Sequence, residues 1–394
     1  MLKKEVNQKV NHVMIKGLLM SLFLFVWCEI FLQIGIFYWS GKPFTSLQPY
    51  VWSPYGLVRN NPKLNSPAFS TSSNGFREII EYDAVKPTNT VRVMLLGGSV
   101  LYSGLGGTPL SKSRRVNSEE TISQFLTAEL VKAPVCKNKN IEVINAAINF
   151  NRIAEITPAY LNEYINWNPD LVIVGSSINN FSGPITPNTL LLGKHPWEAE
   201  FQRLVNDTGL MSSLEVMVRR LSDNLAVVAI AWKTTQKIAN FIDSRKRDLP
   251  ENTVQVLPSN QYNSEELNEE NLQRFASYAG AIVGAANARS QKISFFWEHH
   301  INDSAQFKPL SNDELILRDL NPPYGNPFYQ MQLAWLKDFA YQSGVGFIDP
   351  QVEMMGHEQT IFIDYGHYTA EGNAFMAKVI AARILNDGIC TESY

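Results

Sequence analysis

Two short segments far apart in the chain hold residues that could act together as a nucleophile and its base. Ser99 follows two glycines in Leu-Leu-Gly-Gly-Ser-Val, and His367 lies three residues after Asp364 in Asp-Tyr-Gly-His-Tyr-Thr-Ala-Glu-Gly. A serine hydroxyl attacks an ester only when a base takes its proton, and a histidine oriented by a carboxylate is the usual base. Of the six histidines, only His367 has a carboxylate at a spacing that opens a helix. We therefore predict Ser99 as nucleophile, His367 as its base and Asp364 as the orienting carboxylate.

The chain between these segments alternates between apolar runs and stretches with apolar positions at helical spacing. We predict strands at 91–98, 141–148, 170–177, 292–298 and 345–350, and helices at 119–132, 156–167, 265–288, 326–344 and 369–385. Strands that alternate with helices indicate an α/β fold with a parallel sheet covered on both faces. Ligands bind at the carboxyl ends of such strands, and Ser99 follows the first strand while His367 follows the last.

This combination resembles the SGNH hydrolases, also called the GDSL family. Gly97-Gly98-Ser99 is similar to their first Gly-Asp-Ser block, and Asp364-Tyr-Gly-His367, followed by Thr-Ala-Glu-Gly-Asn, is similar to their last Asp-x-x-His block. The resemblance covers about residues 74–386. It implies a flavodoxin-like fold, which is a three-layer sandwich with a central parallel sheet, and a Ser-His-Asp triad that acts on esters without a cofactor.

The third block of that family, Gly-x-Asn-Asp, resembles Ser-Ile-Asn-Asn at residues 177–180, where the third strand ends. The resemblance implies that the side chain of Asn179 donates a hydrogen bond to the oxyanion, together with the backbone N–H of Ser99. The first and last positions of the block differ from the family pattern, since serine replaces glycine and asparagine replaces aspartate.

The second block of the family is degraded in this chain. It usually has a glycine five residues after a strand-ending asparagine, and the count from Asn145 reaches Phe150. The backbone N–H of Phe150 could still be the third oxyanion donor, because any residue except proline has that group. Its side chain could narrow the pocket, stack on a sugar or turn away, and Asn149 or Asn151 could donate instead. Loss of one donor costs about 2.7–4 kcal/mol of transition-state stabilisation.

Other residues fall near the predicted nucleophile. We expect the pocket to include Gly98, Asn149, Asn180 and His299. His299 belongs to a His-His pair that ends the fourth strand, and the alternative for such a pair is a structural role. Residues 103–118 follow the nucleophile directly and contain several glycines. They are either a mobile lid that carries Arg114 and Arg115 or a disordered surface loop.

An apolar stretch at residues 17–39 is long enough to cross about 30 Å of hydrocarbon as a helix. Lysines at positions 3, 4, 9 and 16 precede it, and few cationic residues follow it closely. The positive-inside rule then places residues 1–16 in the cytoplasm and everything after about residue 40 in the periplasm or outside the cell. We predict a single-pass signal anchor, a stalk and lead-in at 40–90, and a hydrolase-like domain at 91–390 with a helical insertion at about 183–262.

Glu29 lies inside this apolar stretch, and Gln33 follows one turn later on the same face. A carboxyl at membrane depth costs about 2.5–3.5 kcal/mol on insertion scales. Glu29 and Gln33 therefore either contact another membrane protein, or Glu29 is a neutral acid tolerated in a very apolar helix. In the exported part, the compartment permits a disulfide between Cys136 and Cys390, and the sequence does not show whether they approach each other.

The composition limits the classes of function. Charged residues make up 18% of the chain, the formal net charge is −3, and no basic stripe with interleaved aromatic residues occurs. We therefore expect no nucleic-acid partner. No Cys-x-x-Cys or Cys/His cluster has the spacing of metal ligands, so we expect no metal site.

The first functional hypothesis is a membrane-anchored serine esterase or O-acyltransferase that acts on acyl esters of an extracytoplasmic polysaccharide or cell-wall glycan. Water as acceptor makes it an esterase, whereas a sugar hydroxyl makes it an acyltransferase. The alternative is a scaffold that kept the fold, lost turnover and docks in a membrane-associated glycan assembly complex. A third, weaker interpretation is a lipase that acts on membrane lipids.

Overall fold

The computed structural model describes the chain in several stretches. These are residues 2–40, 50–55, 57–62, 64, 70–103, 116–149, 151–176, 180, 221, 225–231, 234–235, 265–320 and 329–391. They fall into two compact units, Met1–Pro49 with Glu200–Val256 and Tyr50–Ala199 with Leu257–Tyr394. The predictions for Phe150, Asn179, Arg114, Arg115 and most of the insertion at 183–262 lie outside the described residues.

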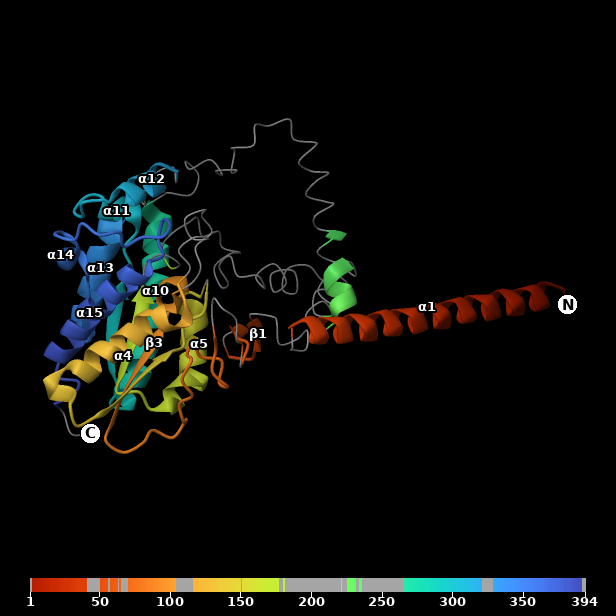
Figure 1. Ribbon diagram of the computed structural model, residues 1–394, viewed down its shortest axis with the longest axis horizontal. Coiled ribbons are helices and arrows are strands. Elements are labelled where there is room, and N and C mark those ends of the chain that lie inside the picture. The colour runs from red at the N-terminus through yellow and green to blue at the C-terminus, as the bar shows by residue number, and fades with distance from the viewer. Residues whose placement is uncertain are drawn as a thin grey trace. The chain divides into compact units, whose positions relative to one another are not determined.

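The larger unit is built on a five-stranded parallel sheet (Figure 1). Its strands are β3 (Thr90–Leu96), β4 (Asn140–Asn145), β5 (Leu171–Ser176), β6 (Lys292–Trp297) and β7 (Gly346–Ile348). They lie in the order β4-β3-β5-β6-β7, and each neighbouring pair runs parallel. The predicted α/β fold class is confirmed, and this strand order is the flavodoxin-like one.

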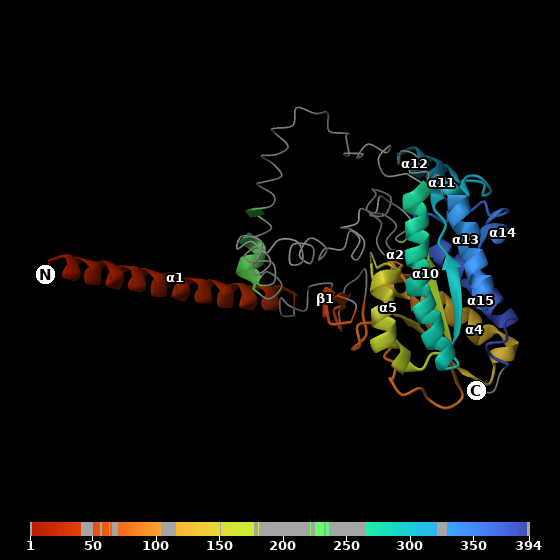
Figure 2. The same ribbon diagram turned by 180° about the vertical axis from the view of Figure 1, so that it is seen from behind.

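Helices cover both faces of this sheet (Figures 1 and 2). On one face, α4 (Ile122–Lys132) packs against α15 (Ala370–Asn386). The other face is covered by α5 (Ile153–Asn162), α10 (Glu265–Ala288) and α13 (Tyr329–Gln342). The connections contain α2 (Ser99–Tyr102), α11 (Ile301–Ser304), α12 (Asn312–Leu320), α14 (Gln351–Met354) and the 3-10 turns Ser118–Glu120, Pro134–Cys136 and Tyr164–Trp167.

The two layers of the core follow from the alternation of side chains along each strand. In β3, Val93 and Leu95 point into the cluster formed with α4 and α15, whereas Met94 and Leu96 point into the cluster formed with α5, α10 and α13. All seven residues of β3 are buried. A strand covered on both faces has a nearly continuous apolar sequence, which is why the sequence predicted it.

A close contact fixes the start of α15, the helix that follows the predicted base. Thr369 caps the helix, since its hydroxyl accepts a hydrogen bond from the Gly372 N–H at 2.9 Å. Gly372 packs against the Ile361 backbone, and a Cβ at this glycine would lie 2.3 Å from the Ile361 carbonyl oxygen. Only glycine allows this approach, so the Gly of the Thr-Ala-Glu-Gly run is needed to bring α15 against residues 361–369.

The lead-in before the sheet is more ordered than its lack of periodicity suggested. Strands β1 (Tyr50–Ser53) and β2 (Leu57–Asn60) form an antiparallel hairpin. Further on, Phe76 is buried in the core beside α5 and α10, and the Arg77 N–H donates to the Asn145 carbonyl at 2.8 Å. This order comes from one aromatic anchor and long-range polar contacts, neither of which leaves a periodic pattern in the sequence.

The smaller unit contains α1 (Leu2–Ser40), whose residues Met14–Trp39 are apolar and long enough to cross a membrane. The Glu29 carboxylate is bonded within the chain: its oxygens accept from the backbone N–H groups of Ala226 and Val227 at 2.9 and 2.8 Å, and from Gln33 Nε2 at 2.6 Å. The carboxylate thus has intrachain partners, which neither interpretation of Glu29 had included. A contact with another membrane protein stays a prediction.

A disulfide joins Cys136, in the turn after α4, to Cys390, just beyond α15. The bonded residues are 254 positions apart in the chain, and their Cα atoms lie 5.1 Å apart. The pairing that the sequence left open is therefore present. Among the described residues, Cys28 in α1 is the remaining cysteine and is free.

Candidate active site

The three residues predicted to act together meet at the carboxyl end of β3. Ser99 Oγ lies 2.7 Å from His367 Nε2, and His367 Nδ1 lies 2.8 and 2.9 Å from the two carboxylate oxygens of Asp364. These distances are those of a nucleophile, its base and the group that orients the base. Ser99 is nearly buried, with 9% of its surface exposed, so its hydroxyl lies in a partly desolvated setting.

A tight loop holds Asp364 and His367 in this arrangement. Asp364 Oδ1 accepts from the backbone N–H groups of Gly366 at 2.9 Å and His367 at 2.8 Å, and the Ile363 N–H donates to the His367 carbonyl at 2.9 Å. Burial raises the pKa of Asp364, but the charge of His367 and these hydrogen bonds outweigh it, so that the pKa lies below the ordinary value of 3.8. Asp364 is therefore ionised at neutral pH, where it gives His367 a negatively charged partner.

Ser99, the predicted nucleophile, begins the short helix α2. Gly98 is extended (φ −90°, ψ −153°), and the Tyr102 N–H donates to its carbonyl at 3.0 Å, which turns the chain directly from β3 into the helix. Gly97 packs on Leu101, and a Cβ there would lie 3.0 Å from Leu101 Cδ1. In the described part of the chain no acceptor is found for the Ser99 N–H. This N–H therefore stays available to an oxyanion on the acyl carbon.

The loop after β4, in which the sequence predicted a degraded second block, is hydrogen-bonded to the turn that carries Ser99. Asn145 Nδ2 donates to the Leu101 carbonyl at 2.8 Å, and its Oδ1 accepts from the Ala147 N–H at 3.1 Å. The Ile148 N–H donates to the Gly97 carbonyl at 3.0 Å. These bonds place the loop beside Ser99, although Phe150 itself lies outside the described residues.

Two of the predicted pocket residues have structural partners. Asn180 Oδ1 accepts from the Ile153 N–H at 2.8 Å and so caps α5. His299 is fully buried, its Nε2 donates to Asp349 Oδ1 at 2.8 Å, and its Nδ1 accepts from the Tyr329 hydroxyl. Burial lowers the pKa of His299, and Asp349 opposes that shift only in part. His299 thus has no exposed surface with which to line a pocket. This burial favours the alternative that the sequence left open, in which the His-His pair has a structural role.

The other histidine of the pair, His300, lies nearer the triad. Its ring centroid is 6.3 Å from that of Tyr365, which in turn is 6.1 Å from that of His367. Burial, followed by the charges of His299 and His367, lowers the pKa of His300 to about 3, so it is neutral at physiological pH. The sequence placed the His-His pair at the end of a strand. Only the packing shows that His300, through Tyr365, is the member nearer to His367.

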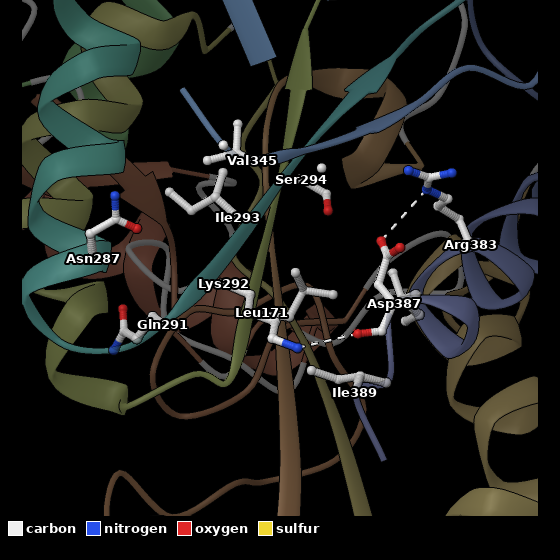
Figure 3. Close-up of a pocket in the computed structure, with 13 residues that line it drawn as sticks. Leu171, Asn287, Gln291, Lys292, Ile293, Ser294, Val345, Arg383, Asp387 and Ile389 are labelled. Carbon is white, nitrogen blue, oxygen red and sulfur yellow. Dashed lines mark hydrogen bonds and ion pairs between the residues drawn. The ribbon is translucent and has the colours of Figure 1, made fainter. Parts of the chain in front are cut away.

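A cavity of about 410 Å³ lies at the opposite edge of the sheet (Figure 3). It is lined by Leu171, Lys292 and Gly346, the first residues of β5, β6 and β7, and therefore cannot include Ser99 at the carboxyl end of β3. Arg383 and Asp387 form an ion pair at its rim, with Nε and Oδ2 3.5 Å apart. Among the described residues, no group of His, Cys, Asp and Glu could hold a metal ion.

No protein-family model and no curated protein matches the chain. Solved structures do. An acetyl xylan esterase is 12% identical, with 74% of this chain and 98% of that chain covered and a TM-score of 0.39. An acetylxylan esterase from Geobacillus stearothermophilus is 12% identical, with 76% and 96% covered and a TM-score of 0.39. An alpha/beta hydrolase enzyme from the metagenome of Lake Arreo, Spain, is 12% identical, with 77% and 97% covered and a TM-score of 0.37. Because identities and TM-scores are low, the chemistry of this chain has to follow from its own side chains.

Proposed function

We propose that the chain is a membrane-anchored serine esterase or O-acyltransferase with Ser99, His367 and Asp364 as its catalytic triad. The observation that carries this proposal is the continuous line of hydrogen bonds from Ser99 Oγ through His367 to Asp364, with every donor–acceptor distance between 2.7 and 2.9 Å. Ser99 and His367 are 268 positions apart in the chain, so only folding brings the serine to the other two residues.

The geometry supports a two-step acyl transfer. Ser99 Oγ attacks the acyl carbonyl carbon while His367 Nε2 takes the hydroxyl proton, and the carbonyl electron pair moves onto the oxygen. The tetrahedral intermediate collapses, His367 returns the proton to the leaving alcohol, and an acyl-serine remains. In the second step, water or a sugar hydroxyl gives its proton to His367 Nε2 and attacks the acyl carbon of the acyl-serine. The acyl–Oγ bond then breaks, His367 returns this proton to Ser99 Oγ, and an acid or a new ester is released.

In this proposal the oxyanion is held by the N–H of Ser99, the side chain of Asn179 and the backbone N–H of Phe150. Support comes from the position of the flanking residues, since the loop at 145–149 is bonded to the nucleophile turn and Asn180 follows β5 at the same sheet edge. Preorganised donors of this kind usually provide the largest single contribution to catalysis, about 10²–10³ in kcat for each donor.

For the substrate we propose an acyl ester on a polysaccharide or glycan outside the cytoplasm. The apolar helix at Met14–Trp39 supports a tether, since a tethered enzyme acts on a polymer made at or passing through the membrane. The disulfide between Cys136 and Cys390 supports an oxidising compartment for the larger unit. The alternative of a scaffold without turnover is disfavoured by the intact distances of the triad.

The test uses the full chain in detergent with p-nitrophenyl acetate, a fluorophosphonate probe and an O-acetylated glycan. We expect the probe to label wild type and not Ser99→Ala, and Ser99→Ala to lower kcat/KM by a factor of at least about 10³. Added oligosaccharide acceptor that raises the release of p-nitrophenol and becomes acylated would identify a transferase. Absence of labelling between about pH 6 and 9, where a histidine can act as base, would refute the triad.

A further inference from the structure

The hairpin β1–β2, which precedes the α/β sheet in the chain, is bonded to the loop that continues from β4 (residues 145–149). Tyr50 and Asn60 face each other across the hairpin. Asn149 Nδ2 donates to the Tyr50 hydroxyl at 2.7 Å, and Asn60 Nδ2 donates to the Ala147 carbonyl at 3.2 Å. Both members of one cross-strand pair thus bind the same short loop.

The loop at 145–149 is in turn coupled to the nucleophile. It is bonded to the turn of Ser99 through Asn145 and Ile148, as described above. The Asn149 N–H has no acceptor among the described residues, and the chain continues from there toward the position of the missing glycine. Any displacement of this loop therefore also displaces the turn that carries Ser99.

The charge of Arg77 acts on Tyr50, and Arg77 is itself held by other residues. The Arg77 guanidinium carbon lies 5.2 Å from the centre of the Tyr102 ring, and its NH1 donates to Ser118 Oγ at 2.8 Å. Burial raises the pKa of Tyr50, and the contacts with Asn149 and Arg77 offset this only in part. The Tyr50 hydroxyl therefore stays neutral and can both accept from Asn149 and donate.

We propose that Tyr50 is a positioning residue for acyl transfer: through Asn149 it fixes the loop at 145–149 beside Ser99, where the oxyanion forms. This inference rests on the proposed esterase function and deepens it. It assigns part of the catalytic arrangement to a segment outside the α/β sheet. The restraint on the degraded second block then comes from the lead-in hairpin.

The first test compares Tyr50→Phe with a matched control in the full chain. Tyr160→Phe removes another buried tyrosine hydroxyl, one that donates to Gln291 Oε1 at 2.6 Å near the opposite sheet edge. We expect Tyr50→Phe to lower kcat for p-nitrophenyl acetate about tenfold with KM changed by less than about twofold, since small misplacements act on the transition state. Tyr160→Phe should change both by less than about twofold. The pH profile of kcat/KM should keep its shape in Tyr50→Phe, because the contact of His367 with Ser99 is untouched.

A double-mutant cycle shows whether Tyr50 acts through its partner. If it does, Tyr50→Phe combined with Asn149→Ala loses no more kcat than Asn149→Ala alone. Losses that multiply, or a kcat that Tyr50→Phe leaves unchanged, would overturn the proposal.

Hydrogen–deuterium exchange gives a measurement that needs no turnover. We expect amides of residues 146–148, which are hydrogen-bonded, to exchange about three- to tenfold faster in Tyr50→Phe, as loss of one hydrogen bond predicts, and amides of α5 to be unchanged. Unchanged exchange in the loop would overturn the inference while leaving the esterase proposal intact. Faster exchange in a chain with no Ser99-dependent turnover would instead refute the esterase proposal, and with it the role of Tyr50 in catalysis. Only the structural contact between Tyr50 and Asn149 would then be supported.

Discussion

Replacing Asp364 by asparagine changes one carboxylate oxygen into a donor NH2 group at nearly constant size. In the structure, Oδ1 accepts from two backbone N–H groups, those of Gly366 and His367, and both oxygens lie within 2.9 Å of His367 Nδ1. The oxygen of the new amide can accept from the N–H groups of Gly366 and His367 only if the amide NH2 group points toward His367 Nδ1. His367 then has to accept at Nδ1 and carry its proton on Nε2, where it can no longer take the proton of Ser99.

The size of this effect follows from the role of the tautomer. In serine proteases, whose catalytic histidine is also oriented by an aspartate, the same substitution lowers kcat by about 10⁴ because it enforces the wrong tautomer. A factor of about 10⁴ corresponds to about 5.4 kcal/mol of transition-state stabilisation. For Asp364→Asn we expect a loss of about 10³–10⁴ in kcat, with KM changed by less than about threefold.

The stability of Asp364→Asn has its own pH dependence. Because the folded-state pKa of Asp364 lies below 3.8, the ionised carboxylate stabilises the fold above that pH, and this contribution is lost as the pH falls through the folded-state value. Wild type should therefore exceed Asp364→Asn in free energy of unfolding by the largest amount at about pH 7, and this difference should become smaller below about pH 4.

The chain offers a matched control in Asp349→Asn, which alters a second, partly buried His–Asp hydrogen bond, between His299 Nε2 and Asp349 Oδ1 at 2.8 Å. The assay measures kcat and KM for p-nitrophenyl acetate in both variants, with circular dichroism to verify the fold. We expect Asp349→Asn to retain at least about a third of wild-type kcat. Equal losses in the two variants, or an Asp364→Asn enzyme with more than about a tenth of wild-type kcat, would refute the assignment of His367 and Asp364.

Three further predictions concern stability and local order. Cys136→Ser combined with Cys390→Ser should lower the free energy of unfolding by about 3–5 kcal/mol in denaturant titrations, since the disulfide closes a very long loop; an unchanged midpoint would contradict this. Burial raises the pKa of Glu78 to about 7 in the folded chain, above its ordinary value of 4.5. The free energy of unfolding therefore falls as the pH rises from 4.5 to about 7. Glu78→Gln should remove this fall, so that the pH–stability curve is flatter in this range, and a steeper curve would contradict the prediction. Glu29→Gln should raise amide exchange at residues 226–227 in the full chain, because a carboxylate that accepts both N–H groups is lost, whereas equal exchange would show that the contact carries no stability.

The sheet and the meeting of Ser99 with His367 were predictable from the sequence for a common reason. Fully buried parallel strands such as β3 are uninterrupted apolar runs, and the strand order places their carboxyl ends together. Ser99 follows β3 almost directly, and His367 comes after β7 and the short helix α14, so a correct assignment of strands places both residues at the same sheet edge. The short loop from Asp364 to His367 needed no long-range information, because its hydrogen bonds lie within four residues.

The contacts that the sequence did not predict are polar and long-range. Asn180 was placed in the pocket by its position after β5, whereas in the structure its side chain caps α5, a choice that depends on where Ile153 lies. The bond between Tyr50 and Asn149 joins residues 99 positions apart. A single tyrosine or asparagine has many acceptable partners, and hydrophobic periodicity does not distinguish among them. The same is true of Glu29, whose partner Ala226 follows 197 residues later.

The disulfide also determines what a protease can separate. The segment between Cys136 and Cys390 contains His367, while Ser99 lies before it. A single cut anywhere between Cys136 and His367 therefore leaves one covalently joined molecule under non-reducing conditions, even though the nucleophile and its base then belong to different polypeptides. Limited proteolysis of fluorophosphonate-labelled chain in this segment should give one labelled species without reductant and, after reduction, a labelled fragment that carries Ser99 and an unlabelled one that carries His367.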